Sequence, residues 1–228
     1  APGVLWAGSD DGLVHVSRDG GQTWQNVTPP DLPEWALISI IEPSPHDPAT
    51  CYLAATRYKL DDFRPYLFKT TDYGQTWTQI TEGIPADDFT RVIREDPNRR
   101  GLLYAGTELG VFVSFDRGTT WTDLRLGLPP LAVVDMKVHP RDNDLVIATH
   151  ARGFYILDDA TPLQELARLV AAAGPAGRLP DVALFPPPRA TRYVPASDTS
   201  VLGNRAWVAP NRPYGAIVSY YLDEAPPS

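Results

Sequence analysis

The sequence has little sulfur, no long apolar segment and a deficit of positive charge. Cys51 is the only cysteine among 228 residues, which excludes an internal disulfide framework and a four-cysteine zinc site. No apolar run approaches the roughly 20 residues that a membrane-spanning helix needs, and residues 1–3 lack the basic and apolar regions of a secretory leader. A net charge of −8 argues against nucleic acid or an anionic membrane as partner. No cofactor motif and no metal-ligand spacing is present, so neither a cofactor nor a metal is expected.

Proline and aromatic residues are plentiful, with 24 Pro, 10 Tyr and 6 Trp, and 43% of residues are hydrophobic, which suffices for a core. An eight-residue pattern, Ser/Thr-x-Asp-x-Gly-x-Thr-Trp, occurs at residues 17–24, 70–77 and 114–121. Successive aspartates of this pattern are 53 and 44 residues apart. That period is typical of one propeller blade per repeat.

Each repeat contains short β-rich segments in a constant order. The first segment ends at a proline, which cannot donate to a sheet ladder, the third precedes the eight-residue pattern, and the fourth begins at its Trp. Counting these segments predicts three strands in residues 4–28, four in 38–81, four in 89–125 and three in 133–157. The fold class expected is therefore all-β, with about 3.5 blades of an incomplete β-propeller, followed by a short helix and a β-rich, proline-containing tail.

The eight-residue pattern falls on the turn between the third and fourth strands, and its chemistry suits a turn. The glycine supplies a positive φ, the aspartate accepts hydrogen bonds from turn N–H groups, and the Trp is large enough to fill the wedge between blades. We therefore assign structural rather than catalytic roles to one set of residues: Asp19, Trp24, Asp72, Trp77, Asp116 and Trp121.

The pattern resembles the Asp-box, or BNR repeat, of sialidases, xyloglucanase-type glycoside hydrolases, photosystem stability factors and sortilin ectodomains. Over residues 3 to 222 the chain is most similar to large bacterial BNR-repeat proteins with a sortilin-like propeller, often labelled glycosyl hydrolases. Residues 148–159 resemble their last propeller segment, except that Ala151 stands where those proteins usually have Gly. The resemblance implies an extracytoplasmic location, whether periplasmic, secreted or at the cell surface.

Three regions follow from this organisation. Residues 1–160 form the propeller blades. Residues 161–174 form a helix, with Thr161 as N-cap, Pro162 at its first position, Gln164 completing a capping box, and an apolar face of Leu163, Leu166, Ala167 and Val170. Residues 175–228 form an extended tail, with β-rich segments at 182–185, 205–208 and 216–222, which resembles entry into a β-sandwich-like domain.

About 3.5 blades leave two open sheet edges, which stable proteins avoid. We therefore expect the remaining blades to come from the same polypeptide or from a second chain. A compact four-blade propeller closed by a strand of the tail is the alternative.

Binding residues are expected on the loops between second and third strands, on the face opposite the Asp-boxes, because loops on a rigid scaffold usually carry function. The candidate ligand-binding residues are Arg57, Tyr58, Asp61, Asp62, Arg64, His150 and Arg152. The leading hypothesis is a binding or scaffold module for a protein, peptide or glycan. The alternative is part of a sialidase- or xyloglucanase-like glycoside hydrolase, which needs two carboxyl groups about 5 to 9.5 Å apart. Its candidate acids are Asp10, Asp11, Asp61, Asp62 and Glu108.

Overall fold

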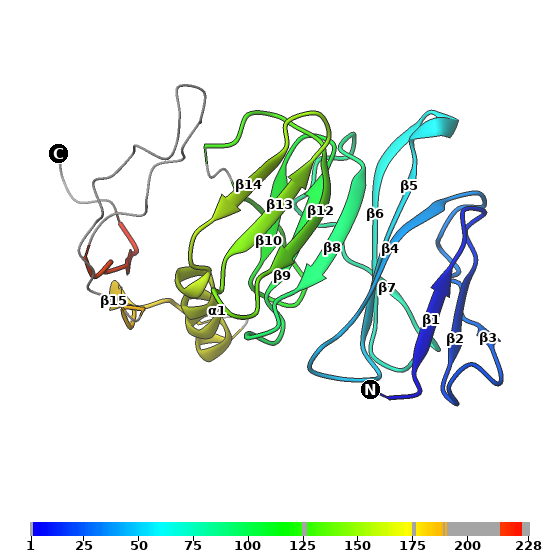
Figure 1. Cartoon of the computed structure of the whole chain (residues 1–228), viewed down its shortest axis with the longest axis horizontal. Coiled ribbons are helices and arrows are strands. Elements are labelled where there is room, and N and C mark those ends of the chain that lie inside the picture. Colours follow the sequence, from blue (N-terminus) through cyan, green and yellow to red (C-terminus); the bar gives the residue numbers. More distant parts are fainter. Residues whose placement is uncertain (1, 125–126, 175–176, 189, 191–214, 225–228) are drawn as a thin grey trace, which may run out of the picture. The chain divides into compact units, whose positions relative to one another are not determined.

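The computed structural model describes the chain except for residues 1, 125–126, 175–176, 189, 191–214 and 225–228. The chain divides into two compact units, residues 1–177 and 178–228. The first unit contains four antiparallel sheets that follow one another along the chain (Figure 1). We call these sheets blades one to four.

Within each blade, strands that are neighbours in sequence pair with each other. Blade one contains β1 (Leu5–Gly8), β2 (Val14–Ser17) and β3 (Gln25–Asn26), and blade two contains β4 (Leu37–Pro43), β5 (Cys51–Arg57), β6 (Asp62–Thr70) and β7 (Thr78–Gln79). Blade three contains β8 (Thr90–Glu95), β9 (Leu103–Thr107), β10 (Val111–Ser114) and β11 (Thr122–Asp123). Blade four contains β12 (Val133–Val138), β13 (Leu145–Thr149) and β14 (Phe154–Leu157). The predicted strand numbers of three, four, four and three are confirmed, and the fold is an incomplete propeller.

The core lies between neighbouring blades. One buried cluster joins blades one and two around Val14, Val16 and Phe68, a second joins blades two and three, and a third joins blades three and four. Glycines in two second strands permit the close approach. A Cβ on Gly8 would lie 2.5 Å from Ile38 of β4, and one on Gly106 would lie 2.6 Å from Val133 of β12. Any side chain at those positions would push the next blade away.

Arg94 of β8 links three blades through their inner strands. Its guanidinium lies 2.7 Å from Glu42 of β4 and 2.6 Å from Asp135 of β12, and its Nε donates to the carbonyl of Met136 at 3.0 Å. Burial raises the pKa of Glu42 although Arg94 opposes the shift. Because both partners of the Glu42 pair are about four-fifths buried, loss of Arg94 would leave a poorly hydrated carboxylate unpaired.

Helix α1 (Thr161–Ala173) follows blade four, and its capping differs from the prediction. The N-cap is Ala160, without a side-chain capping bond, so the assignment of Thr161 as N-cap was wrong. The Thr161 N–H and hydroxyl instead donate to Asp159. Gln164 does not close a capping box, because its side-chain amide donates to the carboxylate of Asp96 in the turn after β8. A local bond to Asp159 thus takes the place of the predicted Thr161 cap, and a tertiary contact takes the place of the Gln164 half of the box.

The apolar face of α1 is only partly as expected. Ala167 is buried in the cluster between blades three and four, and Leu163 packs against that cluster. Leu166 and Val170 are half-buried. The helix therefore belongs to the core of the first unit.

The second unit contains a two-stranded antiparallel sheet of β15 (Val182–Leu184) and β16 (Tyr220–Leu222). These strands lie within the predicted β-rich segments 182–185 and 216–222, and the predicted segment 205–208 lies outside the described residues. In the described part of the chain, no helix has the length and apolar character required to cross a membrane.

Candidate functional site

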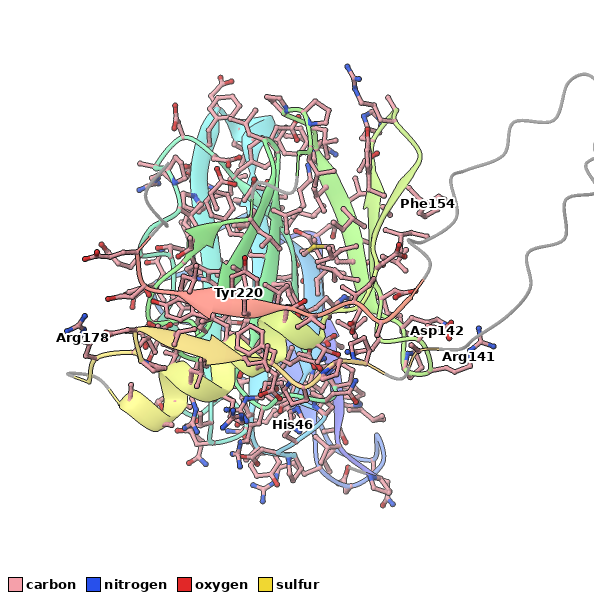
Figure 2. The ribbon with its side chains drawn as sticks, turned by 90° about the vertical axis from the view of Figure 1, so that its left-hand side faces the viewer. His46, Arg141, Asp142, Phe154, Arg178 and Tyr220 are labelled. Atoms are coloured by element: carbon pink, nitrogen blue, oxygen red, sulfur yellow. The ribbon has the colours of Figure 1, made fainter. Side chains whose placement is uncertain are left out.

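The propeller unit has two opposite ends. The turns between second and third strands, including the β5–β6 hairpin, lie at the top of Figure 1. The turns between first and second strands lie at the other end. Figure 2 shows three residues of those turns, His46, Arg141 and Asp142, in the lower half of the view, whereas Phe154, at the start of a third strand, lies in the upper half. The Asp-box turns share the lower end, because they join the other end of the third strands.

The three Asp-boxes make the same hydrogen bonds. In the box of blade two, the Asp72 carboxylate accepts from the Thr70 hydroxyl at 2.8 Å, from the Thr76 N–H at 2.9 Å and from the Thr76 hydroxyl at 2.6 Å. The Gly74 N–H donates to the Thr70 hydroxyl at 2.9 Å. Equivalent bonds recur around Asp19 and Asp116, with every distance within 0.1 Å of these values.

These bonds stabilise the ionised form of each box carboxyl. Hydrogen bonds from Thr23 and Ser17 lower the pKa of Asp19 to about 2, and the pKa of Asp72 is lowered chiefly by Thr76. The pKa of Asp116 is also lowered, because hydrogen bonds from Thr120 and Ser114 outweigh its partial burial. A carboxylate held ionised with its acceptor sites occupied cannot act as a general acid, which agrees with a structural role.

The opposite end contains an irregularity that recurs in three blades. The inner strands β4, β8 and β12 each carry one extra residue relative to the strand beside them. The pairing skips Ser39 between Ile38 and Ile40, skips Arg91 between Thr90 and Val92, and skips Val134 between Val133 and Asp135. Ser39, Arg91 and Val134 are therefore β-bulges at corresponding places. Such bulges redirect a side chain out of the ladder and are frequent beside functional sites.

All three bulged residues line one cavity, which we call the bulge pocket. Its volume is about 620 Å³, within the range of small-ligand sites. Side chains from all four blades and the loop before β4 contribute, and the complete lining is Asp10, Trp35, Leu37, Ser39, Thr56, Arg57, Tyr58, Lys59, Leu60, Arg91 and Val134.

Three polar atoms of this lining are buried without a hydrogen-bond partner among the described residues: Ser39 Oγ, Thr56 Oγ1 and Arg57 Nε. Thr56 is only 5% exposed. A buried polar group without a partner costs about 1 to 3 kcal/mol, and native proteins rarely leave three such groups together. All three atoms are fully buried, so in this structure they lie beneath the surface of the pocket.

Aromatic side chains border the pocket. Trp35 is 65% exposed and has a φ of +62°, so a strained backbone holds a large ring at the surface. Tyr58, in the 3-10 turn η1 (Tyr58–Leu60), stacks on Phe89 with ring centroids 4.9 Å apart. The Arg91 guanidinium lies over both of these rings and bonds Glu108 at 2.6 Å. The pocket thus has a fixed aromatic and cationic border.

The long loop expected in blade two is mostly regular structure. Arg57 ends β5 and residues 62–65 begin β6, with η1 between them. Asp62 accepts hydrogen bonds from Arg57, Arg64 and the Tyr66 hydroxyl at 2.7 to 2.9 Å, and those from Arg64 contribute most to lowering its pKa. Asp62 therefore orders this hairpin and fixes Arg57 beside the bulge pocket.

The other predicted residues lie in separate places. Asp10 lines the bulge pocket, together with Arg57 and Tyr58. Asp61 is exposed and has a φ of +57°, and Arg64 is exposed. Asp11 accepts a hydrogen bond from Ser9 in the turn after β1.

A second, shallow pocket of about 610 Å³ is lined by Glu108, His150 and Arg152 among others. Ala151, between the last two, has a φ of +71°, in the region that favours glycine. That conformation accounts for the glycine that similar proteins usually carry there. The structure thus separates His150 and Arg152 from the Arg57 group, which lines a different pocket.

Sequence reasoning missed most of the bulge pocket. Trp35, Ser39, Thr56, Arg91 and Val134 line the pocket but were not among the predicted site residues. The available signal was the break in apolar alternation where each inner strand begins, but its meaning depends on pairing register. No group of three or more His, Cys, Asp or Glu side chains suited to a metal ion occurs among the residues that the structure describes.

Comparisons with known proteins agree with the fold. The family model for sortilin and neurotensin receptor 3 matches residues 65–165, and the BNR/Asp-box repeat model matches residues 15–26. The curated xyloglucanase Xgh74A of Acetivibrio thermocellus is 26% identical in an alignment 144 positions long, which covers 53% of this chain and 17% of that protein. The chain thus spans about a sixth of the length of this relative.

Solved structures also agree with the propeller fold. YCF48 bound to D1 peptide superposes with a TM-score of 0.53 at 18% identity, covering 69% of this chain and 48% of that one. The GH74 xyloglucanase of Xanthomonas campestris superposes with a TM-score of 0.53 at 18% identity, covering 68% and 25%. At this identity the likeness shows the fold alone. The chain is a BNR-type propeller segment that resembles sortilin-like and GH74 proteins.

Proposed function

We propose that this chain is an extracytoplasmic binding module that holds an oxygen-rich ligand, a glycan or an extended peptide, in the bulge pocket. The remaining blades of the propeller, from the same polypeptide or a second chain, belong to the same proposal. The convergence of all four blades on one cavity, with the three bulged residues in its lining, carries it. The lining includes Lys59 and Arg91, whose side chains can donate hydrogen bonds to hydroxyl or carbonyl oxygens.

The border of the pocket suits the same class of ligand. Trp35 and Tyr58 offer flat apolar surfaces, and aromatic rings supply large contact areas with little loss of conformational entropy. Leu37, Leu60 and Val134 add apolar lining. A sugar ring or an extended peptide presents both apolar faces and projecting oxygens, so either matches this alternation of surfaces.

The similarity to xyloglucanases favours a second candidate, a contribution to a glycoside hydrolase site. That reaction requires a pair of carboxyl groups across the substrate. Of the five predicted acids, Asp10 lines the bulge pocket and Glu108 lines the second pocket. Asp62 is held ionised by Arg64, Arg57 and Tyr66. Binding is therefore better supported than hydrolysis. If an Asp10→Asn variant of the full-length protein lost xyloglucan hydrolysis, the hydrolase role would become the better supported one.

The test is calorimetric titration with xyloglucan oligosaccharides and with a panel of extended peptides. We expect one class to bind, Trp35→Ala to abolish the measurable heat, and Arg91→Ala to weaken binding about tenfold. Trp24→Ala, on an exposed Trp remote from the pocket lining, is the matched control and should leave binding unchanged. Equal binding by the wild type and both pocket variants would refute the assignment of the pocket.

A further inference from the structure

We infer that the Asp-box end carries a second binding site, in which Lys69 of blade two and Arg117 of blade three hold a small oxyanion, a phosphate or carboxylate group. Both side chains line each of two cavities between these blades, whose volumes are about 240 Å³ and 60 Å³. The site lies at the other end of the propeller unit from the bulge pocket. It does not depend on the ligand proposed there.

Lys69 stands where the repeat otherwise places a buried valine. The strand pairing puts Lys69 of β6 at the same position as Val16 of β2 and Val113 of β10. Both valines are 2% exposed and belong to the buried clusters between blades. A lysine at this position partly buries an ammonium group, which costs free energy unless an opposite charge compensates it. Packing between blades therefore does not account for Lys69.

The two cations of the site have no counter-ion. Within the described part of the chain, no carboxylate forms an ion pair with Lys69 or Arg117, and the Lys69 ammonium donates to the main-chain carbonyl of Arg117 at 3.1 Å. Burial lowers the pKa of Lys69, and the charge of Arg117 lowers it further. Arg100, which also lines the smaller cavity, pairs with Asp47 at 3.1 Å. A lysine and an arginine that face one cavity without a counter-ion are suited to bind an oxyanion.

The carboxylates near this pair have other partners. The charges of Glu95 and Asp116 act on Lys69, but neither carboxylate is within ion-pair distance of it. Glu95 is 4% exposed and accepts the N–H of Gly101 at 2.8 Å, and Asp116 accepts three hydrogen bonds within its own Asp-box. Glu82 lines the larger cavity and is exposed. An incoming oxyanion therefore meets the two cations without having to break an ion pair.

The rest of the lining suits a small polar ligand. Gly101 leaves room for the Arg117 side chain, because a Cβ on Gly101 would lie 2.6 Å from Cγ of Arg117 and 3.2 Å from its Nε. Hydroxyl and amide groups can donate further hydrogen bonds to an anion. The larger cavity has four side chains of this kind, those of Thr78, Gln79, Thr81 and Thr119.

The corresponding interface between blades one and two lacks the charge pair. Val16 takes the place of Lys69, and Tyr73 takes the place of Arg117 in the box of blade two. The guanidinium of Arg18 lies over the Tyr73 ring, 4.4 Å from its centroid. The proposed site is therefore specific to the interface between blades two and three and is not a feature of every Asp-box.

The chain contains only three lysines, Lys59, Lys69 and Lys137, so NMR of the lysine side chains can follow the site directly. Inorganic phosphate and acetate are titrated separately at constant ionic strength. We expect the Lys69 signal to shift and saturate with at least one of the two, which identifies phosphate or carboxylate as the group bound. Lys137, exposed on β12, is the internal control, and Lys59 reports on the bulge pocket in the same spectrum.

Two variants copy residues that the repeat already uses at these positions. Arg117→Tyr introduces the residue of blade two and should weaken anion binding at least tenfold, measured at the Lys69 signal. Lys69→Val introduces the residue of blades one and three and should leave the chain folded. The bound anion should raise the urea midpoint of the wild type more than that of Lys69→Val, whose smaller response measures the general effect of the salt.

Two outcomes would overturn the inference. In the first, neither anion gives a saturable shift of Lys69, or all three lysine signals shift together. In the second, Arg117→Tyr binds the anion as tightly as the wild type. Failure of glycan and peptide binding at the bulge pocket would not affect either result, because neither Lys69 nor Arg117 lines that pocket.

Discussion

The Asp-box turns and the bulge pocket lie at opposite ends of the same blades, and they differ in whether their polar groups are hydrogen-bonded. In the boxes, each carboxylate has two side-chain donors and one backbone donor within 3 Å. In the pocket, Ser39 Oγ, Thr56 Oγ1 and Arg57 Nε are buried and unpaired among the described residues. The acidic residues that stand out most in the sequence therefore stabilise the fold and do not form the candidate site.

Acid should remove the contribution of all three Asp-boxes to the free energy of unfolding at once. This is the largest effect we expect. The folded pKa values of Asp19, Asp72 and Asp116 lie below the ordinary value. Their contribution to stability is therefore complete above about pH 4. It is lost as the pH falls through the lowered pKa values, the one of Asp19 being about 2. Urea unfolding between about pH 5 and pH 2.5 should show a steep loss of unfolding free energy.

Two buried carboxyls provide an internal control for that experiment. Burial raises the pKa of Glu42 and of Asp88, so their protonation removes a destabilising charge and cannot produce the loss. An Asp116→Asn chain should lose less stability on acidification than the wild type. An unchanged pH profile in this variant would contradict the role of the boxes.

Asp116→Ala is the next largest change. It removes the acceptor of the Ser114 hydroxyl and of the Thr120 N–H and hydroxyl, so we expect the unfolding free energy to fall by about 2 kcal/mol. Ligand affinity at the pocket should not change, because the box lies at the other end of the blade. Denaturant unfolding and calorimetric titration on the same sample separate the two effects, and a selective loss of affinity would invalidate the comparison.

Thr56→Val should act in the opposite direction. The substitution keeps the shape of the side chain and removes a buried hydroxyl that has no partner, so the unfolding free energy should rise by about 1 kcal/mol. Ligand affinity at the bulge pocket should not change, because this hydroxyl is fully buried. The matched change at an Asp-box, Thr70→Val, should destabilise the chain because that hydroxyl donates to Asp72. Destabilisation by both variants would mean that Thr56 is satisfied in solution.

The smallest contrast concerns two Trp residues in equivalent turns. Trp77→Phe removes the donor to the Val27 carbonyl and should cost about 1 kcal/mol. Trp24→Phe should change the unfolding free energy by less than about 0.5 kcal/mol, as is usual for exposed positions. Denaturant unfolding of both variants tests this. A similar cost at both positions would show that Trp24 already has a partner.

The parts of the fold that repeat could be predicted from sequence. Three copies of one pattern, with the β-rich segments repeated around them, predicted the strand number of every blade and the turn that carries Asp19, Asp72 and Asp116. Repetition helps because the same local pattern can be recognised separately in each copy. Arg57 and Tyr58 were predicted as ligand-binding residues because they lie between the second and third strands of blade two, and both line the bulge pocket.

The parts that depend on contacts between blades could not be predicted. The bulges at Ser39, Arg91 and Val134 arise from strand register, which one sequence does not state. The sequence predicted a capping box within the first turn of α1, but the Gln164 side chain donates instead to Asp96, 68 residues away. From the sequence Asp62 was expected to be an acidic loop residue. In the structure Arg57, Arg64 and Tyr66 donate hydrogen bonds to its carboxylate.

The three bulged residues line the bulge pocket but take no part in the packing between blades. Ser39, Arg91 and Val134 protrude from the ladder at matching heights, and none of them belongs to the buried clusters that join the blades. Substitutions at these positions change the lining of the bulge pocket and leave the buried clusters between the blades intact. In the binding role that we propose, they would alter ligand preference without loss of the fold.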